Sequence, residues 1–348
     1  MKAWMLYGIN DLRYEDTSID PIKEDEVRIR VRAAGICGSD IPRIYETGAH
    51  RMPLIVGHEF SGVVDAVGRE DDSKWLGARV GVFPLIPCRM CKPCRQGHFE
   101  LCRNYDYIGS RRNGAFAEYV SVPADNLIRL PEEVSFEEAA MLEPMAVAVH
   151  AMRKGTREFL LSKEEPVAVC GLGTIGLLLA AFLIEAGYEN LYVIGNKDMQ
   201  REKASALGID AAHYCDSRSV NVGKWLCDRT DGVAVYFECV GKNECITYGI
   251  HAAAPMGTVV CVGNPGTDMT FEKDTYWRIL RNQLTVTGSW NSSFQRDMSD
   301  DWHYVMKRLS EHKIAPTVLI SHRLELAELD KGLAVMRDKT EDYCKIMV

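Results

Sequence analysis

The sequence lacks the features of a membrane or secreted protein. No stretch approaches the roughly 18 uninterrupted apolar residues that a membrane-spanning helix needs. The start, MKAWMLYGINDLRYED, has no basic segment, apolar core or small-residue cleavage site of a signal peptide. We therefore expect a cytoplasmic protein that has reduced thiols and no membrane partner.

A basic surface, internal repeats and low-complexity tracts are also missing. The formal net charge is −8 at pH 7, whereas a general nucleic-acid-binding protein carries a basic stripe. The negative net charge therefore argues against nucleic acid as a partner. With 348 residues, of which 47% are hydrophobic, the chain is long enough for two domains.

Cysteine, by contrast, is plentiful, and four of the twelve cysteines lie between residues 88 and 102. A cluster of this kind in a reducing compartment holds a metal ion, binds an iron–sulfur centre or contains a redox-active pair. We favour Zn²⁺, because four thiolates suit its tetrahedral shell and leave no position open for substrate, which makes the site structural. The predicted ligands are spaced as Cys88-x2-Cys91-x2-Cys94-x7-Cys102.

The apolar pattern divides the chain into two parts. Strand-like runs separated by Gly- and Pro-rich turns make the first half β-rich, at 25–36, 59–67 and 116–122. Short buried strands then alternate with helices, which predicts a parallel sheet with helices on both faces. This α/β domain is expected at 151–287, and the other domain, with the zinc lobe 88–102, at 1–150 and 288–348. Further helices are expected near 199–207, 219–229, 243–254, 299–311 and 325–337.

The glycines of GLGTIG, residues 171–176, lie between a buried strand and a helix, as a dinucleotide fingerprint does. Gly171 permits the tight turn, Gly173 lets a pyrophosphate approach, and Gly176 lets the helix pack on the strand. The alternative is a glycine-rich turn without a ligand. The residues predicted to contact the nucleotide are Gly171, Gly173, Thr174, Ile175, Gly176, Asn196, Lys197, Arg201, Val240, Val262 and Gly263.

The next strand ends in VIGNKD, without the acidic residue that usually selects NAD at this position. Gly195 leaves room for a 2′-phosphate, while Asn196 and Lys197 offer a donor and a charge. We therefore expect NADP, with NAD as the alternative, and expect Gly195→Asp to move the preference toward NAD. The opposing interpretation is that Lys197 and Arg201 are simply solvated.

A second set of metal ligands lies in GICGSD, GHEFSG and MLEP. Cys37, His58 and Glu143 would leave a fourth position open, which is typical of catalytic zinc. Glu59 could orient this site or enter the metal shell. Each residue alone is compatible with a purely structural role, but together with the four-cysteine lobe they predict two zinc ions per chain.

The GHE-x2-G-x5-G motif, the cysteine lobe and GLGTIG resemble the zinc-dependent medium-chain dehydrogenases over essentially the whole chain. The resemblance implies a GroES-like domain joined to a Rossmann domain. It implies Cys37 and His58 as zinc ligands, with Glu143 as the third ligand of the polyol branch and Ser39 in a proton relay. We also expect a homodimer or homotetramer.

Within the polyol (sorbitol) dehydrogenase branch, CGSDIPRIYETGAH, YDYIGSRRNGAFAEY and TGSWN look most like galactitol-1-phosphate 5-dehydrogenase. Two features depart from the pattern, because many sorbitol dehydrogenases have His at the position of Pro42 and the branch usually prefers NAD. The resemblance implies hydride transfer between a polyol, or a polyol phosphate, and its ketose. Arg43, Arg111 and Arg112 are candidate phosphate ligands, unless they are solvated or ion-paired.

Other functions fit parts of the same pattern. Within the enzyme class, the alternative is a secondary-alcohol or butanediol dehydrogenase. Outside it, a zinc-free quinone reductase-like protein should lack the metal ligands that this chain keeps. A non-enzymatic nucleotide-binding protein would bind NADP(H) without turning over any polyol or ketose.

Overall fold

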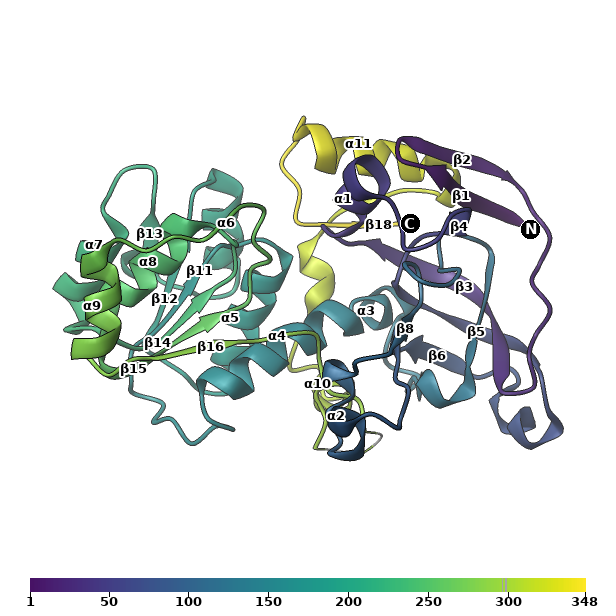
Figure 1. Cartoon of the computed structure of the whole chain (residues 1–348), viewed down its shortest axis with the longest axis horizontal. Helices are drawn as coiled ribbons and strands as arrows, with labels where there is room; N and C mark the ends of the chain where they lie inside the picture. The colour runs from purple at the N-terminus through teal and green to yellow at the C-terminus, as the bar shows by residue number, and fades with distance from the viewer. Residues whose placement is uncertain (296, 298) are drawn as a thin grey trace. The chain divides into compact units, whose positions relative to one another are not determined.

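The computed structural model describes residues 1–295, 297 and 299–348 and divides the chain into two compact units (Figure 1). Unit 1 comprises Met1–Glu143 and Ser293–Val348, and unit 2 comprises Pro144–Ser292. The sequence pattern placed the two boundaries after residues 150 and 287. Helix α4 (Leu142–Gly155) begins in unit 1 and continues into unit 2.

Unit 1 is organised around a seven-stranded sheet in the order β10-β6-β5-β3-β18-β17, with β9 also paired to β3. Its two longest strands, β3 (Glu26–Ile36) and β5 (Glu59–Val67), pair antiparallel and place Gly35 opposite Glu59. A three-stranded sheet, β2-β1-β4, and a β7-β8 pair complete the unit. The other strands are β1 Lys2–Gly8, β2 Asp11–Asp16, β4 Leu54–Ile55, β6 Arg79–Val82, β7 Leu85–Ile86, β8 Asp106–Tyr107, β9 Tyr119–Pro123, β10 Leu127–Arg129, β17 Ile320–Arg323 and β18 Lys345–Met347.

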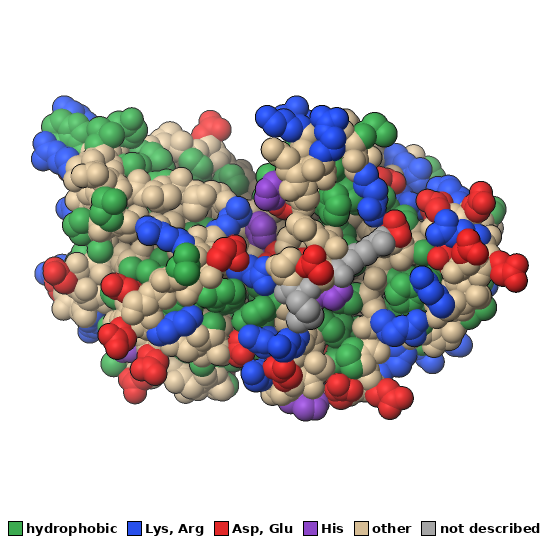
Figure 2. Space-filling model, turned by 90° about the horizontal axis from the view of Figure 1, so that it is seen from below, with side chains coloured by type: hydrophobic (Ala, Val, Ile, Leu, Met, Phe, Trp, Pro, Cys, Tyr) green, Lys and Arg blue, Asp and Glu red, His purple; other side chains and the backbone are tan. Residues whose placement is uncertain are grey.

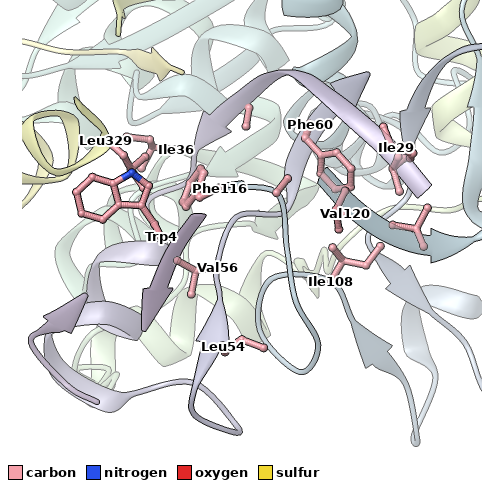
Figure 3. Packing of buried hydrophobic residues seen from close by; sticks show 14 of the residues in the cluster. Trp4, Ile29, Ile36, Leu54, Val56, Phe60, Ile108, Phe116, Val120 and Leu329 are labelled. Carbon is pink, nitrogen blue, oxygen red and sulfur yellow. The ribbon is translucent and has the colours of Figure 1, made fainter. Parts of the chain in front are cut away.

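The core of unit 1 joins the two ends of the chain. Trp4, Phe60, Phe116 and Leu329 belong to one buried apolar cluster (Figure 3). Trp4 Nε1 donates a hydrogen bond to the Leu326 carbonyl at 2.6 Å, so the C-terminal segment is an integral part of this unit. The helices of unit 1 are α1 Asp40–Pro42, α2 Lys92–Arg95, α3 Phe136–Ala140, α10 Asp301–Ser310 and α11 Leu329–Asp338.

Unit 2 contains a six-stranded sheet in the order β13-β12-β11-β14-β15-β16, and all of its neighbouring strands are parallel. Helices connect successive strands, as Figure 1 shows. The strands are β11 Val167–Cys170, β12 Leu191–Gly195, β13 Tyr214–Asp216, β14 Val233–Glu238, β15 Ala253–Cys261 and β16 Thr285–Gly288. The helices are α5 Thr174–Glu185, α6 Asp198–Ala206, α7 Val222–Thr230, α8 Asn243–Ala252 and α9 Lys273–Arg281.

Strand β11 is apolar throughout because both of its faces are covered. Ala168 and Cys170 pack with apolar side chains of α7 and α8. Val167 and Val169 are equally buried, and alternation along a strand turns them to the opposite face. The predicted parallel sheet with covered faces, preceded by a β-rich part, is therefore confirmed.

The surface carries both signs of charge. Figure 2 shows Lys and Arg side chains interspersed with Asp and Glu on the face that it presents. Several such groups are paired, including Arg28 with Asp65 at 2.8 Å and Arg323 with Glu137 at 2.7 Å. Within the described ranges, every helix is too short or too polar to cross a membrane.

Candidate metal centres and nucleotide site

A thiol, an imidazole and a carboxylate meet where β3 ends and β5 begins. The Cys37 Sγ, a ring nitrogen of His58 and a carboxylate oxygen of Glu59 all lie within 4.8 Å of one another. Cys37 follows β3 and His58 precedes β5, so the antiparallel pairing of these strands brings the three residues together. Sulfur, nitrogen and oxygen donors of this kind are the usual ligands of zinc, and the residues therefore fit a zinc ion.

Glu59 is held by a buried cation. Lys345 Nζ, on β18, donates to a Glu59 carboxylate oxygen and, at 3.1 Å, to the Ile36 carbonyl. The side chains of Lys345 and Glu59 are only 3% and 2% exposed. Burial alone would lower the pKa of Lys345, but Glu59 and Cys37 outweigh it and raise that pKa. The lysine therefore stays charged and offsets the negative charge of the group.

Asp40 supports the same group from the other side. Its Oδ2 accepts a hydrogen bond from the Cys37 amide at 3.0 Å, and its Oδ1 lies 3.5 Å from His58 Nδ1. Burial favours a lower pKa of His58, but Asp40 and Cys37 hold that pKa well above its usual value. A carboxylate next to one ring nitrogen is the usual support of a metal-ligating histidine, so the position of Asp40 fits a ring whose other nitrogen binds a metal ion.

Glu143 and Ser39 lie beside these residues. The Glu143 Oε1 accepts a 3.4 Å hydrogen bond from the Tyr107 hydroxyl, and the Tyr107 ring packs edge-on against His58 at 5.8 Å between centroids. Burial raises the pKa of Glu143 to about 7, while His58 opposes the shift and Glu59 adds to it. Ser39 Oγ donates to Cys37 Sγ at 3.3 Å. Among the described residues, the convergent group consists of Cys37, His58 and Glu59, whereas Glu143, the predicted third ligand, lies next to this group rather than within it.

The four clustered cysteines converge on one point. The sulfur atoms of Cys88, Cys91, Cys94 and Cys102 all lie within 4.8 Å of one another, and none of the twelve cysteines forms a disulfide. Backbone amides stabilise negative charge here, since the Cys88 N–H donates to Cys102 Sγ at 3.2 Å. Amide donation from Arg103 and Cys94 lowers the pKa of Cys91 to about 6. Four convergent thiols with amide donors fit a tetrahedral zinc ion.

The three candidate arginines have different surroundings. Arg43 Nη1 donates to Asp40 Oδ1 at 2.6 Å, and Arg112 is paired with buried Glu26. Arg111 stacks over the Tyr105 ring, 4.6 Å from its centroid, and pairs with no carboxylate among the described residues. Its buried Nε also has no hydrogen-bond partner there. Arg111 therefore keeps the most unused donor capacity of the three.

Arg43 and Arg111 both lie close to His50. The His50 amide donates to the Ser110 carbonyl at 3.3 Å, which joins His50 to the loop that carries Arg111. Burial lowers the pKa of His50, and the nearby charges of Arg111 and Arg43 lower it further. The Arg111 amide donates to the Tyr107 carbonyl at 2.9 Å, so this positive region borders the residue that contacts Glu143.

In unit 2, the GLGTIG turn joins β11 to α5. Gly171 has φ +95°, and a Cβ atom there would lie 2.5 Å from Val240 Cγ2. A Cβ at Gly176 would collide with the Gly171 carbonyl, so helix and turn are in direct backbone contact. Gly173 caps α5 without a side chain. Because Gly173 has no side chain, the cap of α5 does not compete with an anion for the backbone amides of the first turn, in which Thr174, Ile175 and Gly176 lie.

Asn196, directly after β12, and Arg201, on α6, are both exposed. The Asn196 amide donates to Gln200 Oε1 at 2.9 Å, and Arg201 lies 3.4 Å from Asp216. The sequence pattern did not single out Arg218, which binds Asp216 and the exposed Asp198, each at 2.6 Å. The carboxylates at this strand end are therefore balanced by arginines.

Three residues of the metal region were not predicted. Asp40 had a signal, because it ends the same GICGSD run that supplies Cys37. No sequence signal indicated Tyr107 or Lys345, since aromatic and basic residues are common in loops and terminal segments. Their contacts become visible only when distant strands are paired.

Two family models match the chain. An alcohol dehydrogenase GroES-like domain matches residues 23–132, and a zinc-binding dehydrogenase domain matches residues 174–311. Galactitol 1-phosphate 5-dehydrogenase of Escherichia coli K12 is 33% identical over 313 residues, which cover 90% of this chain and 89% of that protein.

Solved structures of dehydrogenases are also similar to this chain. A crystal structure of galactitol-1-phosphate dehydrogenase from Escherichia coli has a TM-score of 0.89 at 31% identity and covers 100% of this chain and 99% of its own. A zinc-binding dehydrogenase structure from Sinorhizobium meliloti 1021, described as putative and bound to NADP, has a TM-score of 0.89 at 27% identity, with 100% and 98% covered. The rspB protein of Escherichia coli CFT073, complexed with NADH, has the same score at 26% identity, with 100% and 98% covered.

Proposed function

Because the chain belongs to the zinc-binding alcohol dehydrogenase family, we propose that it interconverts a polyol phosphate and the matching ketose phosphate with NADP(H). The enzyme class, an alcohol or polyol dehydrogenase, follows from the family itself. The phosphate is supported by the positive region of Arg111 and Arg43 beside the metal group. Galactitol 1-phosphate is the first substrate to test, given the similarity to the Escherichia coli enzyme.

The residues of unit 1 supply the parts that the reaction needs. Zinc held by Cys37, His58 and a carboxylate of Glu59 or Glu143 would polarise the substrate oxygen, while the nicotinamide would exchange the hydride. The exposed Ser39 hydroxyl would pass the substrate proton toward solvent. Lys345 holds Glu59 in place, so that one of its carboxylate oxygens is already engaged. Cys88, Cys91, Cys94 and Cys102 would hold the second zinc ion.

Arg111 is the observation that carries the phosphate proposal. A guanidinium group can donate two parallel hydrogen bonds to a phosphate. Arg111 has an unused buried donor and no carboxylate partner among the described residues, whereas Arg112 is already committed to Glu26. Arg43 adds charge but also binds Asp40, which contacts the metal group. We therefore place the phosphate at Arg111, with Arg43 in support.

The test compares kcat/KM for a polyol phosphate with that for the unphosphorylated polyol. We expect the phosphate to be preferred by about tenfold or more, as one charge-assisted contact provides. Arg111→Ala should remove most of this preference and spare the parent polyol. Arg51→Ala, which removes one exposed charge close to His50 in sequence, is the matched control and should keep the preference.

Equal kcat/KM for both substrates in the wild-type protein would contradict the phosphate proposal and indicate a plain polyol dehydrogenase. Higher activity with a secondary alcohol or butanediol than with any polyol would indicate that branch instead. NADPH binding without turnover of any of these substrates would indicate a non-enzymatic nucleotide-binding protein.

We infer a preference for NADP from the end of β12. Gly195 and Asn196 stand where an acidic residue would contact the ribose of NAD. The exposed Arg201 and Arg218 also bring positive charge to this end of the sheet. A 2′-phosphate would therefore meet a strand end that has no acidic residue at positions 195 and 196 and has two exposed arginines nearby.

We also propose that the protein self-associates through the edge of the unit 2 sheet. Strand β16 is the last strand of that sheet and pairs only with β15 among the described strands. Val286 is 40% exposed, and Tyr276 and Leu280, one helical turn apart on α9, are 54% and 56% exposed. An open strand edge with apolar neighbours suits pairing with the same strand of a second copy in a two-fold dimer.

A further inference from the structure

Three neighbouring loops of unit 2 meet at the carboxyl edge of its sheet. Strands β11, β14 and β15 are adjacent and parallel, so the segments that follow them lie on the same edge. They are the GLGTIG turn, residues 239–242 and residues 262–263. In open parallel sheets, ligands bind at this edge, which is where we place the nucleotide.

Glu238, the last residue of β14, binds two of these loops. Its carboxylate Oε1 accepts hydrogen bonds from the amides of Val240 at 2.7 Å and Gly241 at 2.8 Å. Its backbone carbonyl accepts from the amides of Val262 and Gly263, both at 2.8 Å. The side chain is buried, with 2% of the residue exposed, and pairs with no Lys or Arg in the described part of the chain. The Glu238 carboxylate therefore binds backbone amides, and no cationic side chain among the described residues pairs with it.

The contact continues to the GLGTIG turn. The Cys239 amide donates to the Cys170 carbonyl at 2.9 Å, which ties the start of the 239–242 loop to the end of β11. Val240 Cγ2 lies 2.5 Å from the position that a Cβ atom on Gly171 would take. By binding the amides of Val240 and Gly241, the Glu238 carboxylate therefore fixes the position of Val240 next to the Gly171 turn.

We infer that Glu238 is a positioning residue for nucleotide binding: it holds the loop 239–242 against the GLGTIG turn, so that the nucleotide meets a preformed wall. The inference rests on the proposed nucleotide site and touches neither the metal centres nor the phosphate subsite. It predicts that the acceptor geometry of this side chain, more than its charge, sets the affinity for NADPH.

The test titrates NADPH into the full-length zinc-loaded protein and follows nucleotide fluorescence. Glu238→Ala should raise the Kd about tenfold or more, because the loop amides lose their acceptor. Glu238→Gln keeps an acceptor oxygen and should stay within about threefold of wild type. Hydrogen exchange of the Val240 and Gly241 amides should accelerate in the Ala variant and remain slow in the Gln variant.

Val233→Ala is the matched control, because Val233 is fully buried at the opposite end of β14. It should lower the melting temperature while leaving the Kd for NADPH unchanged. An unchanged Kd in Glu238→Ala, an equal loss of affinity in Val233→Ala, or a Gln variant as weak as the Ala variant would each overturn the inference. If the wild-type protein binds neither NADPH nor NADH, the nucleotide site fails first and the inference falls with it.

Discussion

At the scale of single residues, Lys345 and Glu59 form a buried ion pair next to Cys37 and His58, the candidate metal ligands. Removing one partner of such a pair leaves the other charge buried and uncompensated. That loss costs about 3–5 kcal/mol in comparable cases, while replacing both partners with neutral groups costs much less. The effect of removing one partner on stability can therefore be predicted without knowing the substrate.

Lys345→Met should lower the melting temperature and the zinc content of the purified protein. The reason is that the Glu59 carboxylate would lose the buried cation that it binds. The double variant Lys345→Met, Glu59→Gln should recover much of the stability, as measured by thermal unfolding. A single variant as stable as wild type would show that Glu59 is solvated or protonated in solution.

The choice of cofactor also depends on one position, and the structure changes how it should be tested. A Cβ on Gly195 would lie 2.5 Å from the Tyr214 hydroxyl and 2.9 Å from Gln200 Oε1. Gly195→Asp would therefore have two effects: it would introduce the intended negative charge, and its Cβ would crowd Tyr214 and Gln200. This crowding was not predictable from the pattern of VIGNKD, because Tyr214 comes from the following strand.

Gly195→Ala separates the two effects, since it adds the same Cβ without a charge. We expect the ratio of kcat/KM for NADP to that for NAD to fall about tenfold or more from the Ala variant to the Asp variant, because a carboxylate repels the 2′-phosphate. Steady-state kinetics with both nucleotides measures this ratio. A wild-type preference for NAD would refute the interpretation of VIGNKD.

At the scale of elements, the lobe around α2 has little secondary structure of its own. Helix α2 spans only Lys92–Arg95, and its neighbours are turns and a short 3-10 helix at Phe99–Leu101. A segment of turns and single helical turns, without a long helix or a strand, needs another source of order. A zinc ion at the four cysteines would provide it, because binding and folding are coupled at such sites.

Cys94→Ser should therefore reduce the zinc content from two ions to one per chain and lower the melting temperature. His58→Ala should remove the other ion and abolish turnover, while NADPH binding in unit 2 persists. Elemental analysis of protein purified without chelators measures both. One zinc ion or none in the wild-type protein would contradict the two-site proposal.

The elements also show what sequence patterns can and cannot predict. The strands of unit 2 were predictable, because β11 and β12 are buried on both faces and read as short apolar runs. The hairpin of β1 and β2 was not predicted, and β2 is mostly exposed along its length. Strand β16 was missed for the same reason. A strand whose side chains are largely exposed or half-buried has no apolar run to detect.

The candidate site follows the same rule. Cys37, His58 and the four-cysteine lobe were predictable, because metal-ligating residue types at short, regular spacings are uncommon except where they bind an ion. Lys345 was not, since no spacing in KIMV connects it to Glu59. Arg111 and Arg112 are neighbours in sequence, yet the structure pairs only Arg112 with Glu26. Such differences depend on partners that are distant in the chain.

At the scale of the whole molecule, the open edge of β16 predicts the assembly state. Val286→Lys would place a charge on this edge and should convert the dimer to a monomer, or a tetramer to a smaller species. Val220→Lys is the matched control, because Val220 is 41% exposed and lies elsewhere in unit 2. Light scattering after size-exclusion chromatography measures the mass. Unchanged mass in both variants would place the interface elsewhere.

The discontinuity of unit 1 has a consequence for synthesis on the ribosome. Lys345 follows Glu59 by 286 positions, and the whole of unit 2 is made between them. At about 5–20 residues per second, this interval lasts roughly 14–57 s. Unit 2 is one continuous segment and can fold during that time, whereas the proposed ligands Cys37 and His58 remain without Lys345 until β18 has been made. A nascent chain therefore has thiols open to oxidation or to the wrong metal until its last strand is released.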